Sequence, residues 1–70
     1  MIFRRTENNV VEIHDDGTFW TVVPTHYKHI GKFIIVKEDR NTGNVETLIK
    51  DRNQVKTLFD YDVVELMYDG

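Results

Sequence analysis

The sequence predicts a β-rich α+β domain, built as an antiparallel meander of five to six strands with one short helix near residues 52–60. The sheet is expected to be either curled or closed into a small SH3-like barrel. Alanine, the best helix former, is absent, whereas Val, Ile and Thr together number 22 among the 70 residues. Short apolar runs also alternate with turn signals along the chain. The length suits a single domain over residues 1–70.

Three strands are expected in the first third of the chain: residues 2–6, 10–14 and 18–23. In the second of these, Val11 and Ile13 share one face, because side chains alternate along a strand. Asp16-Gly17 indicates a tight hairpin turn, since Asp-Gly suits the positive φ that such a turn requires. Pro24 ends the third strand, because proline has no N–H to donate to the sheet.

After a polar loop at residues 25–31, two further strands are expected: residues 32–39 and 45–50. Gly43 marks the left-handed position of the hairpin loop between them. Asp51 then opens the helix, because Gln54 three residues later completes a capping-box pattern. Residues 62–68 are predicted to form a last strand, in which Val64, Leu66 and Tyr68 alternate with Val63, Glu65 and Met67.

Two of the predicted strands are apolar on both faces, around residues 19–23 and 33–36. One face of each must meet the core. A single two-turn helix is too short to cover the other face of both strands, so we expect a homodimer. Self-association is also a common source of stability in domains of this size.

Several residue types that carry chemistry are absent. The chain has no Cys and no Ser, which removes the two commonest nucleophiles and every Cys-based zinc site. Its four glycines lie too far apart for a phosphate-binding loop. The sequence therefore favours a non-enzymatic protein without a cofactor.

Two kinds of side-chain cluster are the alternatives to this expectation. Acid–base catalysis could use one of two carboxylate pairs, Asp15 with Asp16 or Asp60 with Asp62. A metal could be held only by the three histidines, His14, His26 and His29. Turn formation explains the first pair, and surface exposure explains the histidines, so we expect neither catalysis nor a metal site.

No apolar run approaches the roughly 18 residues needed to cross a membrane, and the first residues lack the apolar core of a signal peptide. We therefore expect no membrane contact and a cytoplasmic location.

The charges are segregated along the chain, although the net charge is only −3. Residues 17–37 contain three lysines and no acid, whereas residues 57–70 contain four acids and no base. Such asymmetry is typical of a protein that steers a charged partner or associates head to tail. The alternative is that the two segments are neighbours in the fold and neutralise each other.

The acidic segment is the stronger candidate for a partner-binding surface. Alternate side chains of a strand stand about 7 Å apart, so repeated carboxylates would form a row resembling a phosphate backbone. A basic nucleic-acid-binding protein would be attracted to such a row. The predicted contacts are the acids Asp60, Asp62, Glu65 and Asp69, the anchors Tyr61 and Tyr68, and the flanking acids Glu38 and Asp39. The alternative is an ordinary amphipathic strand with its acids in water.

In overall character, the chain resembles the small early host-takeover proteins of lytic bacteriophages. The resemblance is carried by residues 60–69 and by Glu38-Asp39. It implies an inhibitor that imitates DNA and binds a basic host protein in the host cytoplasm.

Two other functions remain open. A small nucleic-acid-binding module would use Arg4, Arg5, Lys28, Lys32 and Trp20, with Tyr27 as a further stacking residue. A sequence pI near 5.5 makes direct nucleic-acid binding less expected than protein binding. The third reading is a structural or assembly subunit whose apolar faces join copies of itself.

Overall fold

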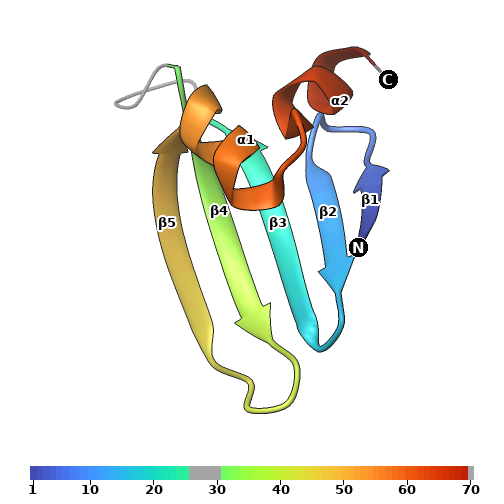
Figure 1. The fold of residues 1–70 in the computed structure, drawn as a ribbon, viewed down its shortest axis with the longest axis vertical. Coiled ribbons are helices and arrows are strands. Elements are labelled where there is room, and N and C mark those ends of the chain that lie inside the picture. Colours follow the sequence, from blue (N-terminus) through green and yellow to red (C-terminus); the bar gives the residue numbers. More distant parts are fainter. Residues whose placement is uncertain (26–30, 70) are drawn as a thin grey trace.

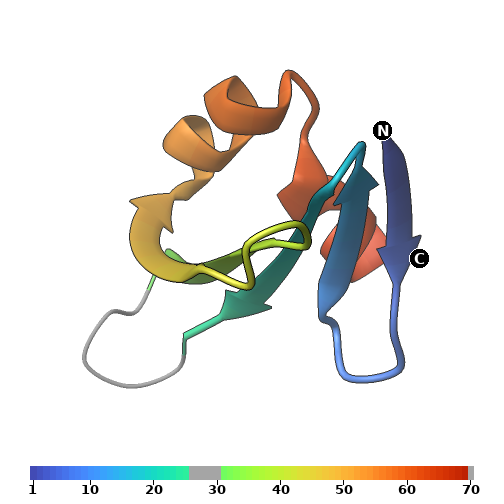
Figure 2. The same ribbon diagram turned by 90° about the horizontal axis from the view of Figure 1, so that it is seen from below.

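The computed structural model describes residues 1–25 and 31–69, apart from the side chain of Asp69. Its elements are β1 (Ile2–Arg5), β2 (Val11–Asp15), β3 (Thr18–Pro24), β4 (Lys32–Asp39), β5 (Val45–Asp51), α1 (Arg52–Phe59) and α2 (Val63–Asp69). The strands form one antiparallel sheet in the order β1-β2-β3-β4-β5, as Figure 1 shows. The predicted meander is therefore confirmed. β1 and β5 are its free edges, so the sheet is open and curled (Figure 2) instead of closed into a barrel.

Local sequence signals account for most of these elements. Each of the five strands predicted before the helix lies within a residue of its expected bounds. Gly17 has a φ of 83°, as the Asp-Gly turn requires. The capping box of α1 is also present, because the carboxylate of Asp51 accepts from the backbone N–H of Gln54 at 2.8 Å, and the amide oxygen of Gln54 accepts from the backbone N–H of Asp51 at 2.9 Å.

The prediction of a last strand over residues 62–68 is wrong, because α2 is a helix. Val63, Val64 and Met67 are at most 3% exposed, whereas Tyr68 is 55% exposed. In a strand, the two adjacent valines would face opposite sides of the sheet. The helix turns both toward the core, and this burial outweighs the preference of β-branched residues for strands.

The start of α2 carries a signal that the alternating pattern concealed. The carboxylate of Asp62 accepts a hydrogen bond from the backbone N–H of Glu65 at 3.3 Å. Asp followed three residues later by Glu is a typical helix start. The chain thus has two short helices among its described residues, where one was expected.

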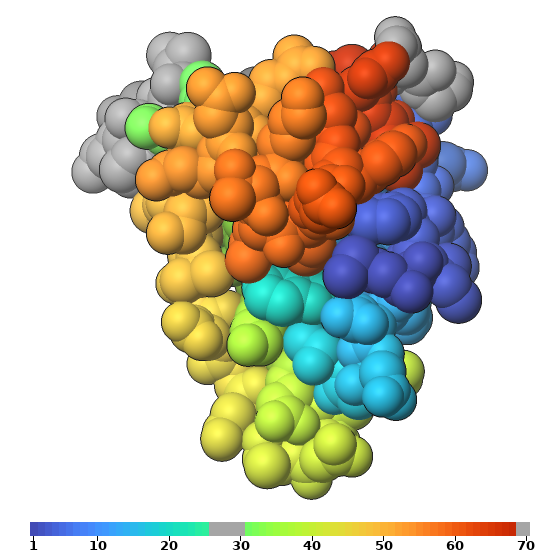
Figure 3. All heavy atoms as spheres, viewed as in Figure 1, coloured from blue at the N-terminus to red at the C-terminus, as the bar shows by residue number. Residues whose placement is uncertain are grey.

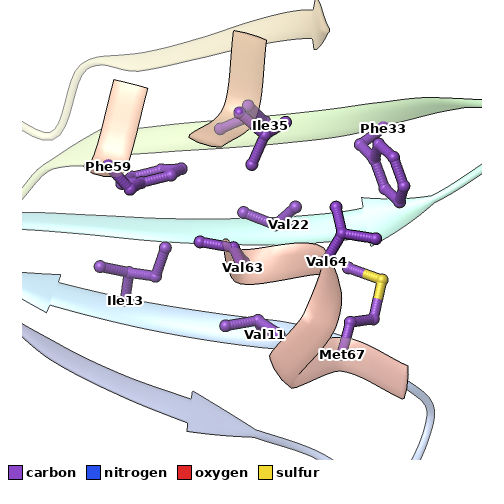
Figure 4. Packing of buried hydrophobic residues seen from close by; sticks show 10 residues of the cluster. Val11, Ile13, Val22, Phe33, Ile35, Phe59, Val63, Val64 and Met67 are labelled. Atoms are coloured by element: carbon purple, nitrogen blue, oxygen red, sulfur yellow. The ribbon is translucent and has the colours of Figure 1, made fainter. Parts of the chain in front are cut away.

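The core lies between the inner face of the sheet and the two helices (Figure 4). The buried residues of this cluster are Val11, Ile13, Val22, Phe33, Ile35, Val55, Phe59, Val63, Val64 and Met67. Burial of each large apolar side chain contributes roughly 1.5–3 kcal/mol. Trp20 packs beside the cluster, with its ring edge-to-face against Phe59 at a centroid distance of 5.1 Å. This packing fixes both helices over β2, β3 and β4.

The outer face of the sheet, opposite both helices (Figure 2), carries an apolar strip across β3, β4 and β5. The register aligns Val23, Ile34 and Ile49 across three neighbouring strands of this face. Val45 and Ile49 are 60% and 47% exposed. The expectation that β3 and β4 are apolar on both faces is therefore confirmed, and the homodimer inferred from it stays a prediction.

Candidate protein-binding surface

The first part of the predicted binding surface lies where α1 meets α2. Asp60, Tyr61, Glu65 and Tyr68 are all exposed there. Asp60 ends α1 in a left-handed conformation, with a φ of 50°. The ring of Tyr61 stacks on Phe3 with centroids 4.8 Å apart, yet 45% of the residue stays accessible. Two carboxylates and two aromatic rings are thus available to a partner at this corner.

Asp62 belongs to the same segment but is engaged within the fold. Its carboxylate accepts two hydrogen bonds from the guanidinium of Arg52, from Nη2 at 2.7 Å and from Nε at 3.3 Å. The Arg52 hydrogen bond, the backbone N–H of Glu65 and the nearby charge of Lys56 hold the pKa of Asp62 below its usual value. The carboxylate of Asp62 is thus occupied by contacts within the fold. Its role in the structure is to join α1 to α2.

A second guanidinium approaches α2 from the sheet. Nε of Arg5 donates to the backbone oxygen of Met67 at 2.9 Å, and Nη2 donates to the side chain of Asn9 at 3.0 Å. Cations next to the last turn of a helix are favourable, because the carbonyl oxygens there carry partial negative charge. Arg5 and Arg52 therefore offset part of the negative charge of the C-terminal segment.

The second part of the predicted surface lies far from the first. Glu38 and Asp39 end β4 at the hairpin end of the molecule, opposite the helices (Figure 1). The longest extent of the molecule is 32 Å, and Figure 1 draws it vertically. Because α2 is a helix above the sheet instead of a strand within it, the eight predicted residues do not form one row. The side chain of Asp69 lies outside the described part.

Glu38 and Asp39 instead meet the turn between β2 and β3. The register places Thr18 opposite both Asp15 and Asp39. The backbone N–H of Arg40 donates to the backbone oxygen of Gly17 at 2.9 Å, which ties the two hairpin loops together. In Figure 3 these loops form one continuous tip below the helices.

We call this region the acidic hairpin tip and define it by the carboxylates Asp15, Asp16, Glu38 and Asp39. Asp39 lies on the face of Thr18 and Asp15, whereas Glu38 lies opposite Phe19 on the other face, so the charges surround the end of the sheet. None of the four takes part in an ion pair with another described residue. Two bases adjoin these carboxylates in the chain, the exposed Arg40 and Lys37, which lines a pocket together with Asp39. Asp39 has a structural role as well, because its Oδ1 accepts from the backbone N–H groups of Asn41 and Thr42 at 2.9 and 3.3 Å.

The sequence reasoning missed Asp15 and Asp16 as members of an acidic surface, because it assigned them only to a turn. A signal was present nonetheless. In an antiparallel meander, alternate hairpins lie at the same end of the sheet. The β2–β3 turn and the β4–β5 loop are alternate hairpins, so their charges must gather at one end.

The residues of the nucleic-acid alternative are dispersed in the described structure. Arg4 and Arg5 point to opposite faces of β1, since neighbouring residues of a strand alternate. Arg4 pairs with Glu12 at 3.8 Å, and Lys32 pairs with Asp51 at 4.0 Å. Trp20 packs against the core. Tyr27 and Lys28 lie outside the described residues.

The other candidates from the sequence are a histidine metal site and a membrane-spanning segment. Within residues 1–25 and 31–69, no three His, Asp or Glu side chains are grouped to hold a metal ion. His26 and His29 lie outside this part, and His14 stacks on Phe19 with centroids 4.7 Å apart. Neither described helix has the length and apolar character needed to pass through a bilayer.

Comparisons with protein-family models, with curated proteins and with solved structures gave no match.

Proposed function

We propose that this domain is a non-enzymatic protein-binding module that contacts a basic surface of another protein through the acidic hairpin tip. The observation that supports the proposal is that the register brings Asp15, Asp16, Glu38 and Asp39 to the same end of the sheet, where none of them forms an ion pair with a described residue. Carboxylates left in water keep their charge available to a partner, and such charge raises association rates and sets specificity.

In its most specific form, the proposal is the mode of action implied by the resemblance to phage host-takeover proteins. The tip occupies the nucleic-acid-binding surface of a host protein, where its carboxylates take the place of phosphates. The exposed corner formed by Asp60, Tyr61, Glu65 and Tyr68 is the second acidic surface of the chain. In this proposal the domain acts as a homodimer, for which the outer face of the sheet and the free edge of β5 are the available surfaces.

The two acidic surfaces can be separated by matched double variants. Asp16→Asn with Glu38→Gln removes two charges from the tip, and Asp60→Asn with Glu65→Gln removes two from the helix corner. Asn is suitable at both Asp positions, because it is tolerated in turns and in the left-handed region. The wild type and both variants are used to capture proteins from a bacterial lysate at low and at high salt.

The proposal requires a basic protein that the wild type retains at low salt, releases at high salt and loses to added duplex DNA. For the recovered protein, the tip variant should raise Kd about tenfold or more, since close interfacial charges are often worth over 1 kcal/mol. The helix-corner variant should bind like the wild type. A reversed result would assign binding to the helix corner. Equal binding by all three proteins would reject an acidic contact, and direct binding of DNA or RNA in a gel shift would favour the nucleic-acid alternative.

A further inference from the structure

The free edge of β5 is long and is not covered by another described element, although the strand itself carries Glu46, Lys50 and Asp51. β5 spans seven residues without a proline, and no other described element lies beside its outer edge (Figure 1). Natural sheets usually shorten, bend or cover such an edge, because its unpaired N–H and C=O groups pair with other strands. An edge of this length is therefore a candidate site for pairing with a strand of another chain.

The ladder fixes which backbone groups of β5 face outward. The backbone N–H of Asp39 donates to the oxygen of Asn44, so this pair is hydrogen-bonded across the β4–β5 hairpin. Hydrogen-bonded and non-bonded pairs alternate along an antiparallel ladder. Glu46, Leu48 and Lys50 therefore bond to β4, whereas residues 45, 47, 49 and 51 direct their N–H and C=O groups to the free edge.

One outward group supports this assignment independently. The N–H of Asp51 is taken by the side chain of Gln54 at 2.9 Å, as expected for a group that does not bond to β4. The outward N–H groups of Val45, Thr47 and Ile49 have no such partner among the hydrogen bonds of the described residues.

The sequence of this edge is complementary to itself. When β5 is paired antiparallel with a second β5 around a two-fold axis at Leu48, Thr47 lies opposite Ile49 and Val45 opposite Asp51. All of these are outward residues, so the parity of the hydrogen bonds is satisfied. In the Val45–Asp51 pair only the carbonyl oxygen of Asp51 is available, because its N–H donates to Gln54. The same register places Glu46 of each copy opposite Lys50 of the other, on the inner face. Non-bonded pairs bring side chains closest together, and opposite charges there are favourable.

We propose that two copies of this chain associate edge to edge through β5, in antiparallel register centred on Leu48, to form a continuous ten-stranded sheet. Neither Glu46 nor Lys50 forms an ion pair within 4.0 Å in the described part of its own chain, although Lys37 lies opposite Glu46 across the β4–β5 ladder. The two-fold arrangement forms two such pairs, so that Glu46 of each copy faces Lys50 of the other. This pairing has the two-fold symmetry common in homodimers: whenever a residue of one copy contacts a second residue of its partner, the reverse contact also forms.

The surroundings of the edge fit a second copy. An open hollow of about 400 Å³ lies where the end of β5 passes into α1, lined by Lys50, Asp51, Asn53, Gln54, Thr57 and Leu58. Leu58 is 41% exposed there, and Val45 and Ile49 are exposed on the outer side. Association along β5 would therefore remove apolar side chains from water on both faces of the joined sheet.

This inference rests on the homodimer part of the proposed function and specifies the interface of that dimer. Antiparallel pairing directs the two acidic hairpin tips in opposite directions, so each copy would bind its own basic partner. A tip variant that no longer binds the basic protein but remains dimeric would contradict the proposed function and leave this inference intact. A wild-type domain that binds the basic protein as a monomer would overturn this inference and leave the acidic contact intact.

Charge reversal tests the register. Lys50→Glu places like charges opposite each other at both symmetric pairs, and Glu46→Lys does the same with the opposite sign. We expect each variant alone to raise the dimer Kd about tenfold or more. An equimolar mixture of the two should form a one-to-one heterodimer, and the double reversal in one chain should restore the homodimer. The measurement is sedimentation velocity from micromolar to millimolar concentration. A wild type that stays monomeric, or variants that dimerise like it, would overturn the inference.

Backbone protection tests the edge itself. Amide hydrogens of Thr47 and Ile49 should exchange more slowly as the wild-type concentration rises, whereas those of Leu48 should be protected at every concentration. Thr47→Pro removes an outward N–H without a ladder bond to β4, and should abolish the dimer while Trp20 fluorescence keeps its folded value. A dimer that survives Thr47→Pro but is lost with Ile34→Glu would place the contact on the outer face and reject the edge. If the proline variant does not fold, exchange and charge reversal still decide the question.

Discussion

Arg52 and Asp62 join the starts of the two helices through a bidentate ion pair, with Nη2 of Arg52 2.7 Å from Oδ2 of Asp62. Arg52 is the first residue of α1, and Asp62 precedes the first residue of α2. Two parallel hydrogen bonds between planar groups fix orientation as well as distance. The pair therefore links the starts of the two helices, whose placement on the sheet comes from core packing.

Removal of this pair should change how stability depends on pH. Because the folded pKa of Asp62 is lower than the unfolded one, its ionised form stabilises the fold above the unfolded pKa, and this stability is lost as pH falls through the folded pKa. Asp62→Asn keeps a residue that can cap α2 but has no charge. At neutral pH the variant should be less stable than the wild type, and the difference should shrink as the pH falls below about 4, near the usual Asp value.

Urea titrations followed by Trp20 fluorescence at several pH values measure this difference. Asp16→Asn is the matched control, because Asp16 is exposed and forms no ion pair with a described residue. A constant gap between Asp62→Asn and the wild type at every pH would contradict the role of the ion pair.

The helical form of α2 predicts unequal effects for two neighbouring residues. Met67 is 0% exposed and Tyr68 is 55% exposed. Met67→Ala should lower the free energy of unfolding by about 2–5 kcal/mol, since it leaves a cavity in the core. Tyr68→Ala should change it by about 0.5 kcal/mol or less. Denaturant titration distinguishes this from a strand, in which Tyr68 would share the buried face of Val64.

The left-handed backbone at Asp60 should make this position sensitive to side-chain shape. With a φ of 50°, Asp60→Gly and Asp60→Asn should leave stability nearly unchanged, because both residues tolerate this conformation. Asp60→Val should cost roughly 1–2 kcal/mol. Thermal unfolding of the three variants provides the comparison, and equal melting temperatures for Val and Gly would contradict the described turn.

The capping box of α1 should contribute measurably to stability. Asp51→Ala removes the acceptor for the N–H of Gln54 and should cost about 0.5–2 kcal/mol. Asp51→Asn retains an acceptor and should cost much less. Circular dichroism with urea measures both variants, and an equally large loss for Asn would indicate that the charge of Asp51, paired with Lys32 at 4.0 Å, matters more than the cap.

Local patterns in the sequence were enough to determine the five strands, the turn at Gly17 and the start of α1. The alternation of Val11 and Ile13, the Asp-Gly dipeptide and the Asp51–Gln54 spacing each act within a few residues, so no distant contact is needed to interpret them. The tertiary structure decided the rest. Val63 and Val64 suit either a strand or a helix, and their packing on the sheet selects the helix that Asp62 caps.

The surfaces depended on tertiary structure in the same way. Asp62 faces Arg52, and Asp15 and Asp16 lie at the same end of the sheet as Glu38 and Asp39, because the chain brings distant residues together through strand register and helix packing. Electrostatic neighbours of this kind are set by positions in space, which a linear charge pattern does not contain.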